Sequence, residues 1–281
     1  MRKNVFRRAT AALLGAAAIA LMAPAANAST EPDAVAQLNS GERLTAGQTM
    51  KSGDSVLVMQ GDGNLVMYLE SSTGVRVKTA LWSTGTYGNP GAYAYMQPDG
   101  NLVVYKQGGT AQSDALWSTG TWNSPGGYLV LYRGAMTLWP GPSGGKGWES
   151  RTGLAPAVGC CGTNPESYLT SARNVEGGQW IQSNTVWLVN QADGNLVLYR
   201  KRDGAALWSS GTWNRGSSML VLSESQWNPA LFLRDNAQRV TWSISVKGSS
   251  DLRGVVQDDG NFVIYNSAGA ALWSTGTWGK A

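Results

Sequence analysis

Short runs in which apolar and polar residues alternate recur along most of the chain, separated by glycine, asparagine and aspartate. In the best-defined example, Ser55–Gln60 and Asn64–Tyr68 flank the turn-forming triplet Gly61-Asp62-Gly63. Alternation with a period of two is typical of a half-buried β-strand, and the triplet has the composition of a hairpin turn. The pattern therefore predicts a protein that is nearly all β.

This hairpin sequence occurs four times, and every copy fits the pattern Q-x-D-G-N-x-V-x-Y. The copies span residues 60–68, 97–105, 191–199 and 257–265. A second phrase, Leu-Trp-Ser-Thr/Ser-Gly-Thr, follows each copy and contains Trp82, Trp117, Trp208 and Trp273, while weaker echoes surround Trp148 and Trp242. These six tryptophans fall into two sets of three, spaced by about 31 to 35 residues. Such periodicity predicts two tandem modules, each built from three repeats.

The segments before and between the modules differ from them in composition. Residues 1–28 combine four basic residues, an apolar run from Ala11 to Met22 and the triplet Ala26-Asn27-Ala28, which is typical of a secretory signal peptide. The stretch between the modules is rich in turn formers. We therefore predict a signal peptide at 1–28, a first domain at 29–154, a linker at 155–166 and a second domain at 167–281. Cleavage near Ala28 would release a secreted protein.

The charge balance changes once this leader is removed. The whole chain carries a net charge of +4, but the leader's four basic residues account for all of it, so the mature protein is formally neutral. Nucleic acid and anionic membranes are therefore not expected partners. No other apolar stretch reaches the roughly 18 residues of a membrane span, so membrane insertion is not expected.

The composition also excludes several chemistries. The chain has no histidine, so it has no Ser-His-Asp triad, Cys-His pair or His-ligated zinc. A glycosidase needs two carboxylates at a defined separation, and only Asp258 and Asp259 are neighbours. Calcium prefers 6 to 8 oxygen ligands, whereas each repeat offers about one carboxylate. We expect no enzyme activity, no metal and no cofactor.

The register of the hairpin decides which side chains lie together. If the connection has three residues, Gln60 pairs across from Asn64, and Gln60, Asn64, Val66 and Tyr68 share one face with Asp62 at the tip. Amides and carboxylates suit adjacent sugar hydroxyls, and apolar carbons suit the C–H ridge of a pyranose ring. A purely structural role for these residues is the alternative, but a turn and a core do not require Gln and Asn in all four copies.

This motif is present in two copies per module, each followed by a tryptophan. It resembles the motif that the bulb-type (monocot) mannose-binding lectins carry three times per module, and the resemblance covers about residues 36 to 281. The resemblance implies two tandem β-prism II domains, each a pseudo-three-fold arrangement of small antiparallel sheets. It also implies mannose bound without metal, with Asp and Asn sharing the axial 2-hydroxyl and Val touching ring carbons. The carbohydrate-binding residues carried over by this resemblance are Gln60, Asp62, Asn64, Val66 and Tyr68; Gln97, Asp99, Asn101, Val103 and Tyr105; Gln191, Asp193, Asn195, Val197 and Tyr199; and Gln257, Asp259, Asn261, Val263 and Tyr265.

Two of the six repeats depart from the motif. In the first module, Leu131, Arg133, Ala135, Thr137 and Trp139 stand where the motif has Gln, Asp, Asn, Val and Tyr. In the second module, the segment from Leu222 to Ala230 is lengthened and lacks the motif. We expect both repeats to serve the fold, while a different ligand at Arg133 with Trp139, or at Trp227 with Glu224, stays an alternative.

The tryptophans and cysteines lie outside the repeated polar motif. The tryptophans of the Leu-Trp-Ser phrases are expected in the core, where they bury much apolar area, rather than at the surface as sugar-stacking platforms. Trp122, Trp213 and Trp278 receive no role. Cys160 and Cys161 are adjacent in the linker, and a strained vicinal bridge, an intermolecular bridge and free thiols all stay open.

The sequence thus predicts a secreted, non-catalytic lectin that recognises mannose or mannose-rich glycans and polysaccharides through several weak sites acting together. A lectin-like bacteriocin that uses the same sites for target recognition is the first alternative. A non-binding envelope adhesion scaffold is the second. A homodimer also stays open.

Overall fold

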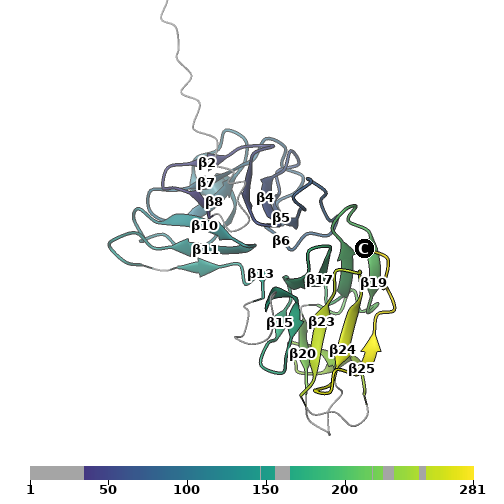
Figure 1. Ribbon diagram of the computed structural model, residues 1–281. Helices are drawn as coiled ribbons and strands as arrows, with labels where there is room; N and C mark the ends of the chain where they lie inside the picture. Colours follow the sequence, from purple (N-terminus) through teal and green to yellow (C-terminus); the bar gives the residue numbers. More distant parts are fainter. Residues whose placement is uncertain (1–34, 146, 156–164, 217, 224–230, 247–250) are drawn as a thin grey trace, which may run out of the picture.

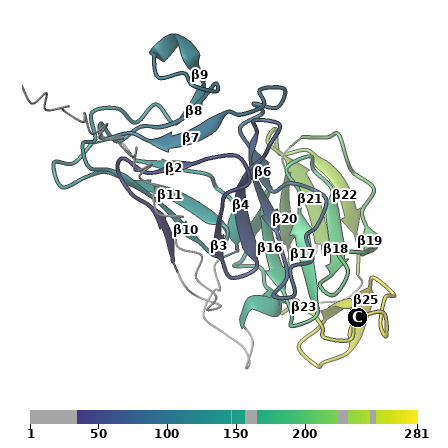
Figure 2. The same cartoon turned by 90° about the horizontal axis from the view of Figure 1, so that it is seen from above.

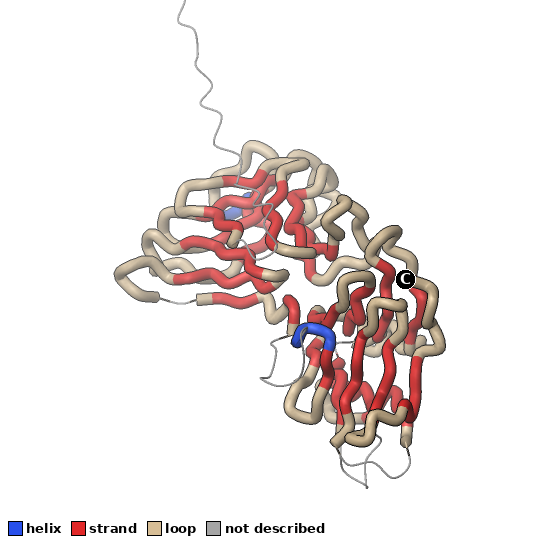
Figure 3. The backbone as a smooth tube through the Cα atoms, in the orientation of Figure 1, coloured by secondary structure: helices blue, strands red, loops and turns tan. Residues whose placement is uncertain are grey.

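The computed structural model describes residues 35–145, 147–155, 165–216, 218–223, 231–246 and 251–281, which form six small β-sheets (Figure 1). Within these residues, helix is confined to two short 3-10 turns, η1 at Gln112–Asp114 and η2 at Pro165–Ser167, and strands supply the remaining regular structure (Figure 3). The predicted signal peptide, most of the predicted linker with Cys160 and Cys161, and the pair Glu224 and Trp227 lie outside the described residues.

Three four-stranded sheets make up the first module. Their strand orders are β1-β10-β11-β12, β2-β7-β8-β9 and β3-β4-β5-β6, with every pair antiparallel. The strands are β1 Ala36–Leu38, β2 Arg43–Leu44, β3 Thr49–Ser52, β4 Ser55–Met59, β5 Leu65–Leu69, β6 Trp82–Ser83, β7 Tyr93–Met96, β8 Leu102–Tyr105, β9 Ala115–Ser118, β10 Tyr128–Tyr132, β11 Ala135–Trp139 and β12 Trp148–Glu149. Each predicted repeat therefore supplies a hairpin and the tryptophan strand beside it.

The second module repeats this plan. Its sheets are β14-β23-β24-β25, β15-β20-β21-β22 and β16-β17-β18-β19, and the last of these gains a fifth strand, β13, at its edge. The strands are β13 Gly153–Leu154, β14 Tyr168–Leu169, β15 Val175–Glu176, β16 Gln179–Gln182, β17 Val186–Asn190, β18 Leu196–Arg200, β19 Ala206–Ser209, β20 Ser218–Leu222, β21 Leu231–Asp235, β22 Val240–Ile244, β23 Arg253–Val256, β24 Phe262–Tyr265 and β25 Ala271–Ser274. In both modules the first three short strands pair with the third, second and first hairpins in that order. The fold is all β, and each module has the three-sheet arrangement of a β-prism II domain.

Three tryptophans meet edge to face where the sheets of each module converge. In the first module the ring centroids of Trp82, Trp117 and Trp148 are 5.4 to 5.9 Å apart. Trp208, Trp242 and Trp273 form the matching triad, with centroids 5.7 to 6.3 Å apart. Both triads pack against the buried apolar clusters of their modules. The six tryptophans thus pack onto the cores of their modules, as predicted, and each is partly rather than fully buried.

An extensive buried interface joins the two modules, which lie side by side in both views (Figures 1 and 2). β13 pairs in parallel with β16, so the predicted domain boundary at residue 154 falls at the end of a strand that belongs to a second-module sheet. Trp180 and Trp187, buried on the outer face of that sheet, join an apolar cluster that includes the core of the first module. Asp54 accepts hydrogen bonds from Trp187 Nε1 at 2.8 Å and Lys201 Nζ at 2.6 Å.

The connection between β5 and β6 is longer than the corresponding connections in the other five repeats. Ion pairs to a buried carboxylate, that of Glu70, hold it in place. Glu70 is 7% exposed and forms ion pairs with Lys51 and with Arg76, whose Nη2 lies 2.6 Å away. Burial raises the pKa of Glu70, but the hydrogen bonds and positive charges of Lys51 and Arg76 outweigh that effect and hold the pKa below its ordinary value. Residues 75–81 of this connection contact the second module. The carbonyl oxygen of Arg76 lies near Gly204, and that of Leu81 lies near Gly178.

We predict that Trp117→Ala lowers the free energy of unfolding of the mature chain by about 3 kcal/mol, because it removes one ring of a three-ring contact and leaves a cavity. Trp139→Ala is the matched control, since Trp139 is 52% exposed, and it should change the value by less than about 0.5 kcal/mol. Urea unfolding followed by circular dichroism measures both. Equal effects of the two substitutions would contradict the assignment of the triad to the core.

We predict that Glu70→Gln lowers stability at pH 7 by about 1 to 2 kcal/mol and flattens its dependence on pH. Because the folded-state pKa of Glu70 is depressed, its contribution is present above the ordinary carboxyl pKa and is lost as the pH falls through the lower, folded-state value. Urea unfolding at several pH values between about 3 and 7 measures this, with the exposed Glu149→Gln as control. Parallel curves for wild type and Glu70→Gln would show that the carboxylate does not act in this way.

Candidate functional site

The four intact motifs lie on the hairpins β4-β5, β7-β8, β17-β18 and β23-β24. In the first, the backbone N–H of Gln60 donates to Asn64 O at 2.8 Å and that of Gly63 donates to Gln60 O at 3.1 Å. The connection therefore has three residues, as predicted, and Gln60 lies opposite Asn64. The same pair of bonds occurs in the other three hairpins.

A glycine closes each of these turns for two reasons. Gly63, Gly100, Gly194 and Gly260 all have φ of 91°, in the left-handed region that side chains rarely adopt. A Cβ on Gly63 would also lie 2.0 Å from Asn89 O, and one on Gly100 would lie 2.1 Å from Ser124 O. The turn thus needs glycine both for its conformation and for the close approach of the next loop.

The glutamine and tyrosine of each motif point toward one another on a shared face. Gln60 Nε2 donates to the Tyr68 hydroxyl at 2.9 Å. The corresponding distances are 2.9 Å for Gln97 and Tyr105, 2.7 Å for Gln191 and Tyr199, and 3.0 Å for Gln257 and Tyr265. Burial raises the pKa of Tyr105, so its hydroxyl keeps its proton at neutral pH and can donate it to a ligand.

The aspartate at the tip of each turn uses only one of its two carboxylate oxygens inside the protein. Asp62 Oδ1 accepts the backbone N–H of Asn64 at 3.0 Å, an Asx turn that orients the carboxylate. Asp99, Asp193 and Asp259 make the same contact at 2.9 to 3.0 Å. All four aspartates are exposed, and Oδ2 of each makes no hydrogen bond within the described chain.

Sequence reasoning missed the residues that hold the asparagine. Asn64 Oδ1 accepts from Thr84 Oγ1 at 3.0 Å and from the backbone N–H of Thr86 at 3.1 Å, while Thr86 Oγ1 donates to Gly63 O at 2.7 Å. We call these two hydroxyl residues the hydroxyl clamp. The other clamps are Thr119 and Thr121, Ser210 and Thr212, and Thr275 and Thr277. The repeated phrase Ser-Thr/Ser-Gly-Thr contains both hydroxyl residues, so it is the sequence signal for the clamp.

Each intact motif therefore presents a fixed set of unused polar atoms. Asparagine Nδ2 and the tyrosine hydroxyl can donate, and aspartate Oδ2 and glutamine Oε1 can accept. We call the shallow surface formed by the glutamine, aspartate, asparagine, valine and tyrosine of one motif the dish. The valine is 2 to 3% exposed in all four copies and forms the floor of the dish. Such alternating donors and acceptors over an apolar floor match a pair of neighbouring sugar hydroxyls.

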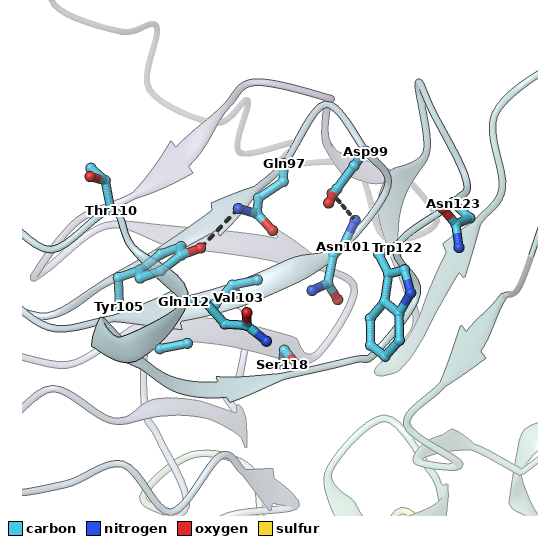
Figure 4. Close-up of a pocket in the computed structure, with 11 residues that line it drawn as sticks. Gln97, Asp99, Asn101, Val103, Tyr105, Thr110, Gln112, Ser118, Trp122 and Asn123 are labelled. Atoms are coloured by element: carbon cyan, nitrogen blue, oxygen red, sulfur yellow. Dashed lines mark hydrogen bonds between the residues drawn. The ribbon is translucent and has the colours of Figure 1, made fainter.

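Figure 4 shows the side chains of the second motif around a pocket. Gln97, Asp99, Asn101, Val103 and Tyr105 all line one open pocket of about 560 Å³. The side chains of Gln97 and Tyr105 meet at one end, and those of Asp99 and Asn101 lie at the other, next to Trp122 (Figure 4).

The third intact motif is closed by the first module. Gln191 is 4% exposed, whereas Gln60, Gln97 and Gln257 are all partly exposed. The Tyr199 hydroxyl lies 3.3 Å from Thr79 Oγ1, and Val197 and Tyr199 share a buried apolar cluster with Val77 and Leu81. No sequence pattern predicts that residues 75–81 cover this face. We therefore omit the set Gln191, Asp193, Asn195, Val197 and Tyr199 from the open sites.

The degenerate repeat of the first module differs from its sequence alignment. Tyr132 pairs with Ala135 across a two-residue turn, so Tyr132 and not Leu131 takes the place of the glutamine, and Leu131 is fully buried. The turn is one residue shorter, and Arg133 has φ of 46°. Arg133 forms an ion pair with Glu166, which links this hairpin to the start of the second module. The clamp bond from Thr152 Oγ1 to Gly134 O persists at 2.7 Å although no asparagine is present.

The described residues contain no group of three or more His, Cys, Asp or Glu side chains that could hold a metal ion. Asp258, the neighbour of Asp259, accepts hydrogen bonds from the backbone N–H and Nδ2 of Asn184 at 2.8 and 2.9 Å. Its carboxylate is thus engaged away from the dish. In the part of the chain that the structure describes, no helix is long and apolar enough to cross a membrane.

Comparisons with known proteins agree with this geometry, although no family model matches the chain. Mannose-specific lectin 2 from Colocasia esculenta is 29% identical over 242 residues, which cover 85% of this chain and 84% of that protein. A monomeric monocot mannose-binding lectin from Gastrodia elata is 31% identical over 42% of this chain and 96% of its own, with a TM-score of 0.33. The two-domain lectin of Scilla campanulata is 26% identical over 83% of this chain and 94% of its own, with a TM-score of 0.31.

The match to the Colocasia lectin covers most of both chains, and the motif that carries the family resemblance occurs four times. The Colocasia and Scilla proteins match across both modules. The chain therefore belongs to the bulb-type (monocot) mannose-binding lectin family, as a tandem-domain member.

Proposed function

We propose that the protein is a secreted, non-catalytic lectin that binds mannose or mannose-rich glycans at three open sites, those of Gln60, Gln97 and Gln257. The observation that carries this proposal is the repeated set of unused donors and acceptors around a buried valine. Each set is held rigid by the glycine turn and the hydroxyl clamp before any ligand arrives. Little ordering is then required when a sugar binds.

The arrangement of free atoms indicates how one sugar would sit. At the second site, Asp99 Oδ2 can accept the proton of a hydroxyl whose oxygen accepts from Asn101 Nδ2. At the other end, Gln97 Oε1 and the Tyr105 hydroxyl can serve a second hydroxyl in the same reciprocal way. An axial hydroxyl between Asp and Asn, as the family resemblance implies, would select mannose over glucose because the wrong epimer would cover the Asp and Asn side chains without giving them a hydrogen-bond partner.

Several features support the remaining parts of the proposal. The Colocasia relative is named as mannose-specific, and it matches both modules. Two open sites lie on the first module and one on the second, which permits multivalent attachment. The leader of residues 1–28 supports secretion. The engagement of Asp258 by Asn184 leaves Asp259 without a free carboxylate neighbour in its turn, which supports binding without catalysis.

We predict that isothermal titration of the mature chain with methyl α-mannoside gives three equivalent weak sites per chain. Asp62→Ala, Asp99→Ala and Asp259→Ala should each remove one site, because each deletes the acceptor and the Asx turn that orients the asparagine. Asp193→Ala is the matched control and should leave the number of sites unchanged, since its dish is closed. Heats that survive the triple substitution of Asp62, Asp99 and Asp259 would refute the site assignment.

We also predict that Asp99→Ala weakens binding to a surface coated with mannose-rich glycan by more than tenfold, although only one site in three is lost. Tethered weak sites multiply rather than add their contributions when their spacing permits simultaneous contact. Surface plasmon resonance on the coated surface, compared with titration by the free monosaccharide, measures the difference. If the surface affinity falls only in proportion to the number of sites, the sites act independently.

A further inference from the structure

An exposed aromatic side chain follows the hydroxyl clamp in every intact repeat. Tyr87, Trp122, Trp213 and Trp278 are 72%, 58%, 58% and 73% exposed, and they are four of the six clearly exposed aromatic residues in the described chain. The same position holds Gly153 in the degenerate repeat of the first module and Lys247 in that of the second. The aromatic residue is thus present where the Gln-Asp-Asn-Tyr set is present and absent where that set is lost.

Neither packing nor turn formation accounts for these residues. An aromatic side chain that is more than half exposed contributes little to the core, and the clamp and its turn persist at Thr152 without one. Scattered surface tryptophans need no explanation, but four at one structural position do. Their common feature is the neighbouring sugar-binding motif.

The hydroxyl clamp fixes the backbone beside the dish, and so it fixes the base of the aromatic side chain. Thr121 is fully buried, its N–H donates to Asn101 Oδ1 at 3.1 Å, and its hydroxyl donates to Gly100 O at 2.7 Å. Trp122 is the next residue. Its indole lies back over Gly120, where an added Cβ would meet Cζ3 at 3.5 Å, and Trp213 lies over Gly211 in the same way at 3.6 Å.

The second site shows where such a ring stands relative to the ligand. Trp122 and Asn123 line the same pocket as Gln97, Asp99 and Asn101, and the indole forms its wall beyond the Asp99 and Asn101 side chains (Figure 4). The polar dish accommodates one pyranose, and the space next to it ends on an aromatic face. Aromatic faces suit the C–H ridge of a pyranose ring, and an exposed tryptophan also retains an N–H donor.

We infer that Tyr87, Trp122 and Trp278 form a second subsite at the three open sites, on which the neighbouring sugar of the same mannose-containing chain stacks. This inference rests on the proposed function, since the aromatic ring acts on the sugar next to the one held in the dish. Trp213 stands beside the closed motif and has no first sugar to extend. The site therefore recognises an oligosaccharide rather than a single terminal residue.

The test compares methyl α-mannoside with α-1,2-, α-1,3- and α-1,6-linked mannobiose by isothermal titration of the mature chain. In the triple variant Tyr87→Ala, Trp122→Ala, Trp278→Ala, affinity for at least one mannobiose should fall by about fivefold, the scale of one aromatic contact. Affinity for methyl α-mannoside should stay within twofold. Replacement of the same three residues by Phe should retain most of the mannobiose affinity, and Trp139→Ala and Trp213→Ala should change neither.

Other outcomes distinguish a failure of the second subsite from a failure of the proposed lectin function. If wild type binds methyl α-mannoside but prefers no mannobiose, or if the triple Ala variant loses both ligands equally, the second subsite is refuted while the lectin function stands. If the triple Ala variant binds every sugar as wild type does but associates less with itself in sedimentation, the aromatics form a protein contact instead. If wild type binds neither sugar while folded, the proposed function itself fails.

Discussion

A glycine in the left-handed conformation, packed against the backbone of a neighbouring segment, is the constraint on which each intact motif depends. It sets a three-residue turn, and the turn sets the register that brings glutamine, asparagine, valine and tyrosine to one face. A two-residue turn, such as the one at Arg133, moves the partner of the first position by one residue. Both turns contain a left-handed glycine, so the length of the turn separates the intact motifs from the hairpin at Arg133.

Repetition makes the fold predictable from sequence to an unusual degree. Alternating residues and the period of the tryptophans were enough to predict strands, three repeats per module and the tryptophan core, because these features depend on local propensity and on burial that every repeat shares. The three-residue turn was predictable for the same reason, since Gly63 and Pro98 each suit one position of a known hairpin type. The hydroxyl clamp was visible as Ser-Thr-Gly-Thr, but its role requires the distance between Thr84 and Asn64 across two strands, which the sequence does not give.

Contacts between the modules were not predictable, because they depend on features that only one repeat has. The extended loop after β5, anchored by Glu70, reaches the second module and covers the face that carries Gln191 and Tyr199. Trp180 and Trp187 replace smaller residues on that face and complete the interface. The motif at Gln191 keeps its Gln-Tyr bond, turn and clamp inside the interface. An intact sequence motif is thus retained at a position where the other module covers its glutamine and tyrosine.

The central claim is that three copies of one rigid dish are open to mannose and a fourth is closed by protein. The most direct measurement is a crystal structure of the mature chain with methyl α-mannoside bound. The account predicts one sugar in each of the dishes of Gln60, Gln97 and Gln257, with a hydroxyl between Asp Oδ2 and Asn Nδ2, and none at Gln191. Sugar bound elsewhere on the surface while these three dishes stay empty, or sugar in the dish of Gln191, would contradict it.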